Sequence, residues 1–142
     1  MELKIKYISK EIDKIEKISI GDWIDLRSAE NIKLKAGETA VIRLGVAMEL
    51  PEGYEALVVP RSSTLKHFGV MQTNSVGVID NSYRGEWRFP MYALRDTEIH
   101  VNDRVCQFRI LENQPKFNIV EVDELESDTE RSCNGFGSTG KN

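Results

Sequence analysis

The run Gly77-Val-Ile-Asp80-Asn-Ser-Tyr83-Arg-Gly85 contains the residues of this sequence that are best suited to chemistry. It places the carboxylate of Asp80 between two apolar residues and a turn, with the aromatic ring of Tyr83 three positions later. An aspartate held at the end of a strand can orient a water molecule and accept its proton. The alternative is a turn aspartate that hydrogen-bonds only its own backbone. Taken alone, the run favours the turn.

The run Pro60-Arg61-Ser62-Ser63-Thr64 offers a second set of groups, suited to binding an anion. A guanidinium can donate two parallel hydrogen bonds to a phosphate. The hydroxyls stand where we expect a helix to begin, and the free N–H groups of a helix N-terminus attract anions. The alternative is an ordinary capped helix with a surface arginine, and the run fits both interpretations equally.

Asn74 is a candidate for binding a nucleobase. Its side-chain amide carries both a donor and an acceptor, which can pair with the imide edge of a uracil ring. A lone asparagine is nevertheless more typical of a turn, so this position becomes informative only in combination with others.

The C-terminal segment 131–142 combines a cation, two hydroxyls and several glycines around one aromatic residue, Phe136. Glycines let a backbone close tightly over phosphates, to which Arg131, Ser138 and Thr139 can also donate hydrogen bonds. An exposed phenylalanine is explained if its ring covers an apolar or aromatic surface. Composition alone favours the alternative, a disordered terminus without a role.

Length and composition indicate a single domain. The chain has 142 residues, of which 40% are hydrophobic and 30% charged, enough for one packed core. A net charge of -4 leaves no basic field of the kind that nucleic-acid binding requires. Two cysteines provide no disulfide framework, and no apolar segment approaches membrane-spanning length. We therefore expect a cytoplasmic protein that binds neither nucleic acid nor a membrane.

The elements that must position these residues are mostly strands. Leu3, Ile5 and Tyr7 alternate with charged residues, which predicts a first strand with one buried face. The segment 10–20 fits either a short helix or a connector. The runs 41–47 and 48–50, the turn Pro51-Glu-Gly53 and the run 54–59 predict a hairpin. A short helix is expected at 62–66, with hydroxyls capping its first N–H groups.

The C-terminal half continues the same pattern. Alternation over 105–110 after the turn Asn102-Asp103 predicts a strand in which Gln107 faces away from Cys106 and Phe108, and 117–122 is expected to form a last strand. The acidic run 123–130 is typical of a solvated connector. Short strands separated by turn residues predict an all-β, jelly-roll-like sandwich with one short helix. We expect a core over 1–122, a connector over 123–130 and a mobile arm over 131–142.

These segments occur in an order and spacing that resemble the trimeric dUTPases of bacterial or phage type. The resemblance runs from about Gly21 to Gly140. It rests on five matching runs, of which the one around Asp80 and the one around Phe136 are the most specific. The matching runs are Trp23-Ile-Asp25-Leu26, Pro60-Arg61-Ser62-Ser63, Gly77-Val-Ile-Asp80-Asn-Ser-Tyr83-Arg-Gly85, Arg104-Val-Cys-Gln107 and Gly135-Phe-Gly-Ser-Thr-Gly140, with Arg131 upstream. The resemblance assigns no role to Trp87 or Phe89, for which we favour the strand core over a place against the base.

The resemblance implies a role for each group of residues. Asp80 would activate the attacking water, and Tyr83 would stack on the deoxyribose and exclude a 2'-hydroxyl. Asn74 and the backbone of Gly77, Val78 and Ile79 would bind uracil. The phosphates would be held by Arg61, Ser62, Ser63 and Gln107, the last as part of the catalytic set. In the arm, Phe136 would close over the base while Arg131, Gly137, Ser138 and Thr139 wrap the triphosphate.

The implied reaction is hydrolysis of dUTP to dUMP and pyrophosphate, in sites shared between the subunits of a homotrimer. Water attacks the α-phosphorus in line, and Mg²⁺, reached by Asp25 through water, neutralises the triphosphate. This activity keeps uracil out of DNA and supplies dUMP for dTMP synthesis. If the chain is encoded by a phage, a regulatory protein partner is a further expectation.

Two rival functions remain at this stage. The dCTP deaminases share the fold, but they carry a glutamate ten residues after the matching aspartate, where this chain has Pro90, and tend to have phenylalanine in place of Tyr83. Both differences favour the hydrolase. The other rival is a non-catalytic nucleotide sensor whose dUTP-bound arm recruits a partner.

Overall fold

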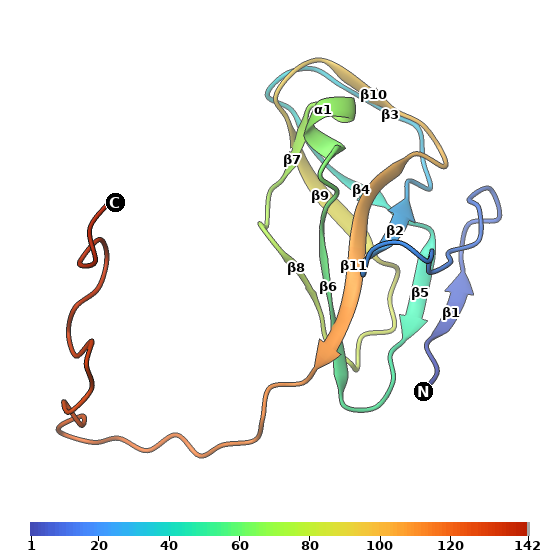
Figure 1. Cartoon of the computed structure of the whole chain (residues 1–142). Coiled ribbons are helices and arrows are strands. Elements are labelled where there is room, and N and C mark those ends of the chain that lie inside the picture. The colour runs from blue at the N-terminus through green and yellow to red at the C-terminus, as the bar shows by residue number, and fades with distance from the viewer. Residues whose placement is uncertain (142) are drawn as a thin grey trace.

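The computed structural model describes residues 1–141, within which the chain forms eleven strands and one helix. In chain order these are β1 (Lys4–Tyr7), β2 (Ile24–Arg27), β3 (Ile32–Leu34), β4 (Thr39–Arg43), β5 (Val46–Glu49), β6 (Tyr54–Pro60), α1 (Thr64–Phe68), β7 (Val70–Gln72), β8 (Gly77–Ile79), β9 (Arg88–Ala93), β10 (Thr97–Ile99) and β11 (Arg104–Glu112). Figure 1 shows them as a β body from which the C-terminal segment extends.

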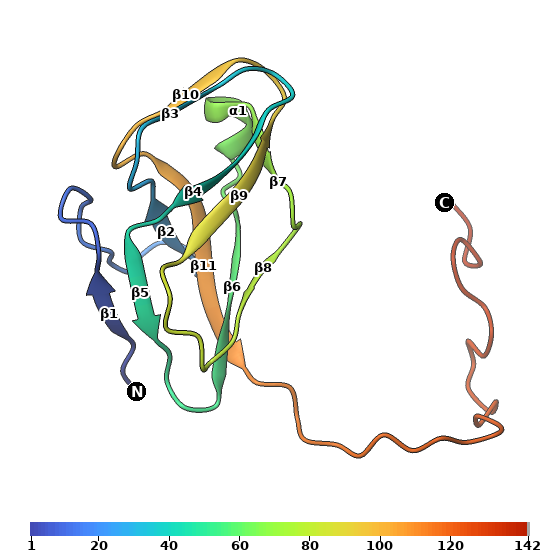
Figure 2. The ribbon, with the colours of Figure 1, turned by 180° about the vertical axis from the view of Figure 1, so that it is seen from behind.

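Two antiparallel sheets form the body. One has the strand order β2-β11-β6-β8 and the other the order β4-β9-β7, and the ribbons β1-β5 and β10-β3 complete the layers. Figure 2 shows β4 and β9 in front of β6 and β11. The predicted all-β, jelly-roll-like sandwich with one short helix is confirmed.

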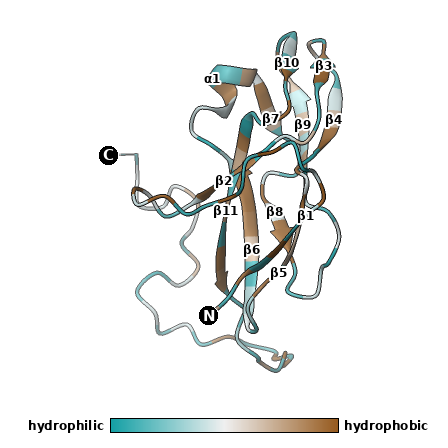
Figure 3. Ribbon diagram, turned by 90° about the vertical axis from the view of Figure 1, so that its right-hand side faces the viewer, coloured by the Kyte–Doolittle hydropathy of each residue, from teal (hydrophilic) through white to brown (hydrophobic). Residues whose placement is uncertain are grey.

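Large apolar side chains fill the space between the sheets. The rings of Trp87 and Phe108 meet edge to face with centroids 5.2 Å apart, a favourable geometry for aromatic pairs. Trp87, just before β9, and Phe89, within it, are both fully buried, so both belong to the core as expected. Figure 3 shows how hydrophobic residues concentrate on β6 and β8. The body is therefore stabilised mainly by removing these side chains from water.

The alternating patterns correctly predict the strands β1 and β11. In β1, Ile5 and Tyr7 are half-buried while Lys4 and Lys6 are exposed. In β11, Cys106 and Phe108 are buried while Gln107 is only partly covered. The segment 10–20 is a connector without a helix or strand, anchored by the buried side chain of Ile12.

The predicted hairpin around Pro51-Glu-Gly53 is wrong in its pairing. Both strands and the turn exist, and the turn is closed by the N–H of Tyr54 donating to the carbonyl of Pro51 over 3.1 Å. However, β5 pairs with β1, while β6 pairs with β11 and β8. The two strands diverge after the turn because each buries its apolar side chains in a different sheet, and partners distant in sequence satisfy their backbone groups.

The helix begins two residues later than predicted and lacks the expected cap. Ser63 is its N-cap residue, but its hydroxyl makes no capping hydrogen bond. The hydroxyl of Thr64 instead accepts a hydrogen bond from the N–H of Arg61 over 2.8 Å. At five residues this helix, the only one among residues 1–141, is too short to cross a membrane.

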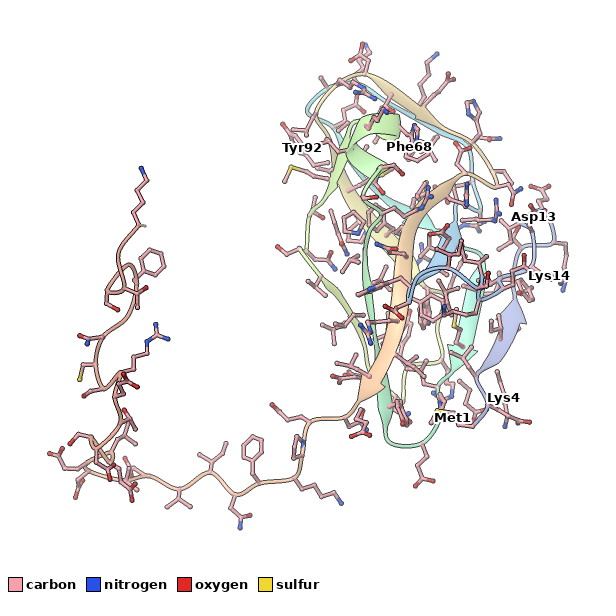
Figure 4. All side chains as sticks on the ribbon, in the orientation of Figure 1. Met1, Lys4, Asp13, Lys14, Phe68 and Tyr92 are labelled. Atoms are coloured by element: carbon pink, nitrogen blue, oxygen red, sulfur yellow. The ribbon has the colours of Figure 1, made fainter. Side chains whose placement is uncertain are left out.

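The last predicted strand, 117–122, does not form. The chain after Glu112 has neither helix nor strand up to residue 141, and Ile119 is 91% exposed. A strand needs a neighbour to satisfy its backbone groups, and this segment leaves the body without meeting one. Figure 4 shows the side chains of this segment standing apart from those of the body.

Candidate functional site

A polar cavity of about 650 Å³ lies at the end of β6, where residues from several segments meet. β11 runs between β2 and β6, so that Gln107 is paired with Asp25 on one side and with Val59 on the other. Of the residues predicted to hold the phosphates, the cavity wall contains Arg61, Ser62 and Gln107 but not Ser63, and it also contains Asp25, the residue predicted to reach the metal. Asp13 and Lys14, labelled in Figure 4, belong to the connector that forms its outer wall.

Asp25 is the electrostatic centre of this cavity. One carboxylate oxygen lies 3.0 Å from Nε of Arg61, and the other lies 3.3 Å from a terminal guanidinium nitrogen of Arg104. Arg61 also donates to the backbone carbonyl of Arg104 over 3.2 Å. The carboxylate thus holds two guanidinium groups on one wall, where they can face an anion. Sequence reasoning assigned no role to Arg104, although it opens the strand that carries Gln107.

The buried side chain of Thr64 fixes the turn that carries Arg61. The Thr64 side chain is fully buried, accepts from the N–H of Arg61 and donates to the carbonyl of Val105 over 2.9 Å. Gln107 adds a hydrogen bond of 3.0 Å to the carbonyl of Pro60. The backbone on both sides of Arg61 is therefore tied to β11. Sequence reasoning placed Thr64 among the hydroxyls that could cap the helix or bind an anion, and not in this buried supporting position.

Cys106 lies beneath the same wall and is fully buried. Burial, and secondly the carboxylate of Asp25, raise the pKa of its thiol, while Arg61 opposes them. The thiol therefore stays protonated at neutral pH and acts as a small core residue rather than as a nucleophile.

The residues predicted to bind uracil lie on the loop between β7 and β8 and on β8 itself. Asn74 is exposed, and Ser75 adopts a positive φ of 62° that turns the loop. β8 pairs with β6 in the register Val58↔Gly77 and Ala56↔Ile79. At Gly77 an added Cβ would lie 3.2 Å from Cβ of Val58, so the glycine lets β8 approach β6 closely.

Asp80 follows β8 and is exposed in a well-fixed turn. The neighbouring Asn81 side chain donates to the carbonyls of Pro51 and Tyr54, each over 2.8 Å. The N–H of Tyr83 closes the turn on the carbonyl of Asp80 over 3.1 Å. The carboxylate is therefore free to bind water while its backbone is held in place.

The ring of Tyr83 is locked against the same turn. Its hydroxyl donates to the carbonyl of Glu86 over 2.9 Å. An added Cβ at Gly85 would come within 2.7 Å of the ring carbon Cζ, so the ring would have to shift. Gly85 thus sets the position of Tyr83 by leaving room for it.

Within one chain, Asp80 and Arg61 lie at opposite ends of β6. Asp80 comes one residue after Ile79, the partner of Ala56 near the start of β6, whereas Arg61 follows the last residue of β6. At the usual strand rise this separation is roughly 20 Å. Arg61 also points to Asp25 on β2 and so away from β8, which lies on the other side of β6.

The predicted arm residues form a third, separate group. The segment 113–141 extends away from the body (Figure 1), and Phe136 is fully exposed. The glycines at 137 and 140 adopt positive φ values near 85°, and Arg131 bonds only locally, donating to the carbonyl of Asn134 over 2.7 Å. The structure thus places the site residues in three groups that one copy of the chain does not bring together.

Asp25 is the residue predicted to reach a metal. Among residues 1–141, no group of three or more His, Cys, Asp and Glu side chains gathers to hold an ion. Mg²⁺ commonly keeps several water ligands and binds through one carboxylate and the substrate phosphates. The cavity wall also carries the carboxylates of Asp13, Glu16 and Asp22. Asp25 is the one that contacts both Arg61 and Arg104, a position that fits a magnesium ion arriving with the triphosphate.

Comparisons with known sequences give a consistent match. The family model described as dUTPase matches residues 23–140. A deoxyuridine 5'-triphosphate nucleotidohydrolase derived from the SPbeta prophage of Bacillus subtilis is 57% identical over 99% of both chains. The deoxyuridine 5'-triphosphate nucleotidohydrolase of Finegoldia magna is 41% identical over 97% of this chain and 99% of its own.

Solved structures give the same match in three dimensions. A mutant dUTPase of Staphylococcus bacteriophage 80alpha, with dUpNHpp, superposes with a TM-score of 0.85 at 26% identity, over 99% of both chains. A second structure of that phage enzyme gives the same values, and its description states that phage dUTPases control the transfer of virulence genes.

Proposed function

This chain belongs to the dUTPase family and hydrolyses dUTP, and we propose that it does so by activating a water molecule with Asp80. The water attacks the α-phosphorus in line, which releases dUMP and pyrophosphate. This would keep uracil out of DNA and supply dUMP for dTMP synthesis. The observation that carries the mechanism is the exposed Asp80 carboxylate on a turn held by both hydrogen bonds of Asn81.

The water needs a base that is close, correctly oriented and unprotonated. The carboxylate of Asp80 can accept the proton of that water as the new P–O bond forms. The fixed turn limits the positions open to that carboxylate, which lowers the entropic cost of aligning water with phosphorus.

The cavity around Asp25 would hold the phosphates. Arg61 and Arg104 supply positive charge, and Gln107 and the hydroxyl of Ser62 supply neutral donors on the cavity wall, to which the neighbouring Ser63 would add a second hydroxyl. Asp25 would hold Mg²⁺ through water, and the ion when bound neutralises charge on the triphosphate. The arginines remain oriented by Asp25 throughout, so little reorganisation is needed as negative charge develops on the leaving pyrophosphate.

Selection for uracil would come from Asn74 and the backbone of Gly77, Val78 and Ile79. Cytosine reverses the donor and acceptor at two ring positions, so a site that bonds the uracil edge would leave buried groups unpaired. The extra methyl of thymine would be excluded by steric contact. Tyr83 would stack on the deoxyribose and leave no room for a 2'-hydroxyl.

A complete site would need several copies of the chain. Within one copy, Asp80 and Arg61 lie roughly 20 Å apart along β6, and Arg61 points away from β8 towards Asp25. A triphosphate whose α-phosphorus lies at Asp80 would therefore take its arginines from a neighbour. The extended arm would reach a third copy, where Phe136 covers the base. A closed homotrimer satisfies these requirements with identical contacts at every interface.

An assay over the deoxynucleoside triphosphates tests this function against both rivals. We expect pyrophosphate release from dUTP and at most weak release from dCTP and dTTP. Ammonia release from dCTP without pyrophosphate from dUTP would identify a deaminase. Nucleotide binding without either product would identify a sensor that acts through a partner.

Substituting Gly85 with alanine should weaken the discrimination against ribonucleotides. The new methyl group displaces the Tyr83 ring, since a Cβ at this position would lie within 2.7 Å of it. We expect the ratio of kcat/KM for dUTP over UTP to fall by about tenfold, the scale of a misplaced steric contact. Tyr83→Phe is the matched control, because it removes the hydrogen bond to Glu86 but leaves the ring. An unchanged ratio in the glycine variant would remove Tyr83 from sugar selection.

A further inference from the structure

Gln72 is a buried polar side chain that the proposed mechanism does not use. It lies at the end of β7 and is only 7% exposed. Its Nε2 donates a hydrogen bond to the backbone carbonyl of Val58 over 3.1 Å. Its Oε1 is buried and has no hydrogen-bond partner within residues 1–141. Burying an unpaired amide oxygen lowers stability, so this residue type is not explained by packing.

The orientation of the Gln72 amide is fixed by its surroundings. Rotating the amide by half a turn would place Oε1 against the carbonyl of Val58, where two acceptors repel each other. Nε2 must therefore face Val58, which leaves the buried Oε1 without a partner among residues 1–141. An apolar side chain of similar length would avoid this cost, and in the register of β7 and β9 its direct neighbour Met91 is such a residue.

The Gln72 hydrogen bond joins the two sheets at the base of the loop that carries Asn74. β7 belongs to the sheet β4-β9-β7, while Val58 lies on β6 in the other sheet. Val58 is also the register partner of Gly77, the first residue of β8. A Cβ at Gly77 would lie 3.4 Å from Nε2 of Gln72. Gln72 thus stands at the β7 end of the loop. Its amide reaches the β8 end through Val58, the register partner of Gly77.

The loop has few other constraints of its own. Its backbone bonds are those of the Val76 N–H to the carbonyl of Asn74, over 2.6 Å, and of the Thr73 N–H to the carbonyl of Pro90, over 3.2 Å. Asn74, Ser75 and Val76 are exposed. The position of Asn74 is therefore set mainly by the relative placement of the strands β7 and β8, which the Gln72 amide controls.

We propose that Gln72 is a positioning residue for base recognition, which holds the Asn74 loop at the spacing that fits the pyrimidine ring. It does not touch the nucleotide, and it acts through Val58 and Gly77. The inference rests on the proposed role of this loop in binding uracil. It accounts for a buried amide that costs stability, since such a cost is retained where geometry matters for function.

The test is Gln72→Met, which keeps length and removes both the donor and the unpaired acceptor. We expect the KM for dUTP to rise by about tenfold, the effect of a loosened binding loop, with a smaller change in kcat. The melting temperature should stay within about 5 °C of the wild type, because loss of one hydrogen bond is offset by removal of the unpaired oxygen. Met91→Leu is the matched control, because it alters the same β7–β9 pair without touching the carbonyl of Val58.

Binding measurements separate this inference from the proposed function. Calorimetry with dUMP and with inorganic pyrophosphate reports the base end and the phosphate end of the site whether or not turnover occurs. We expect Gln72→Met to weaken binding of dUMP and to leave binding of pyrophosphate unchanged. Equal weakening of both ligands, unchanged affinity for dUMP, or an equal effect of Met91→Leu would overturn the role of Gln72. A wild type that binds dUMP but releases no pyrophosphate from dUTP would instead overturn the mechanism.

Discussion

Asp80→Asn lowers kcat for dUTP by about 10²- to 10⁴-fold, the usual contribution of a general base. The amide has nearly the same size as the carboxylate, and the hydrogen bonds of Asn81 that hold the turn do not involve the Asp80 side chain. The asparagine amide cannot accept the proton of the attacking water. We therefore expect binding of dUTP to persist while pyrophosphate release in a single turnover almost disappears.

Asp123→Asn provides the control for the same chemical change, because this aspartate lies in the exposed acidic connector. Its kcat should equal that of the wild type. Binding of dUTP is measured by calorimetry for both variants, so that a folding defect is recognised as a loss of affinity. Normal turnover in Asp80→Asn would show that another group activates the water.

Mixing two inactive variants should restore activity if sites are shared between copies. Arg61→Gln removes one of the cations of the phosphate cavity, and Asp80→Asn removes the base, so each homotrimer has only defective sites. When the chains exchange, a site that takes Asp80 from one variant and Arg61 from the other is complete. With random mixing of equal amounts, about a quarter of the sites have this combination.

The experiment requires co-unfolding and refolding, or co-expression, so that mixed assemblies form. Light scattering should give the mass of three chains for each variant and for the mixture. The two variants mixed without chain exchange serve as the control and should stay inactive. No recovery in properly mixed trimers, or an active monomer, would show that one copy contains a whole site despite the roughly 20 Å along β6.

The chemical groups of the candidate site were predictable from the sequence, whereas several of their contacts were not. The type and order of the chemical groups were predictable, because a carboxylate, a guanidinium and a glycine-rich arm have the same chemistry wherever they lie. The contacts of Arg104 and the buried position of Thr64 were not predictable. Both depend on the register of β11 against β2 and β6, and register is set by packing between strands distant in sequence.

The fold shows the same division. Alternating residues identified β1 and β11, since a period of two is a property of the chain itself. The pairing of β5 and β6 was mispredicted, because a short turn favours a hairpin only when no distant partner buries the strands better. The strand expected over 117–122 is absent although its residues are typical of a strand. No neighbouring strand of the same copy pairs with it.

The sequence alone determined the groups available for catalysis, the β character of the chain and the apolar positions of its core, because each follows from residue type and local period. Tertiary structure decided which groups meet. It assembled Asp25, Arg61 and Gln107 into one cavity, carried Asp80 to the far end of β6, and left Phe136 on an extended arm. The reason is physical: such distances depend on long-range strand pairing and on burial shared between sheets, which no single stretch of residues encodes.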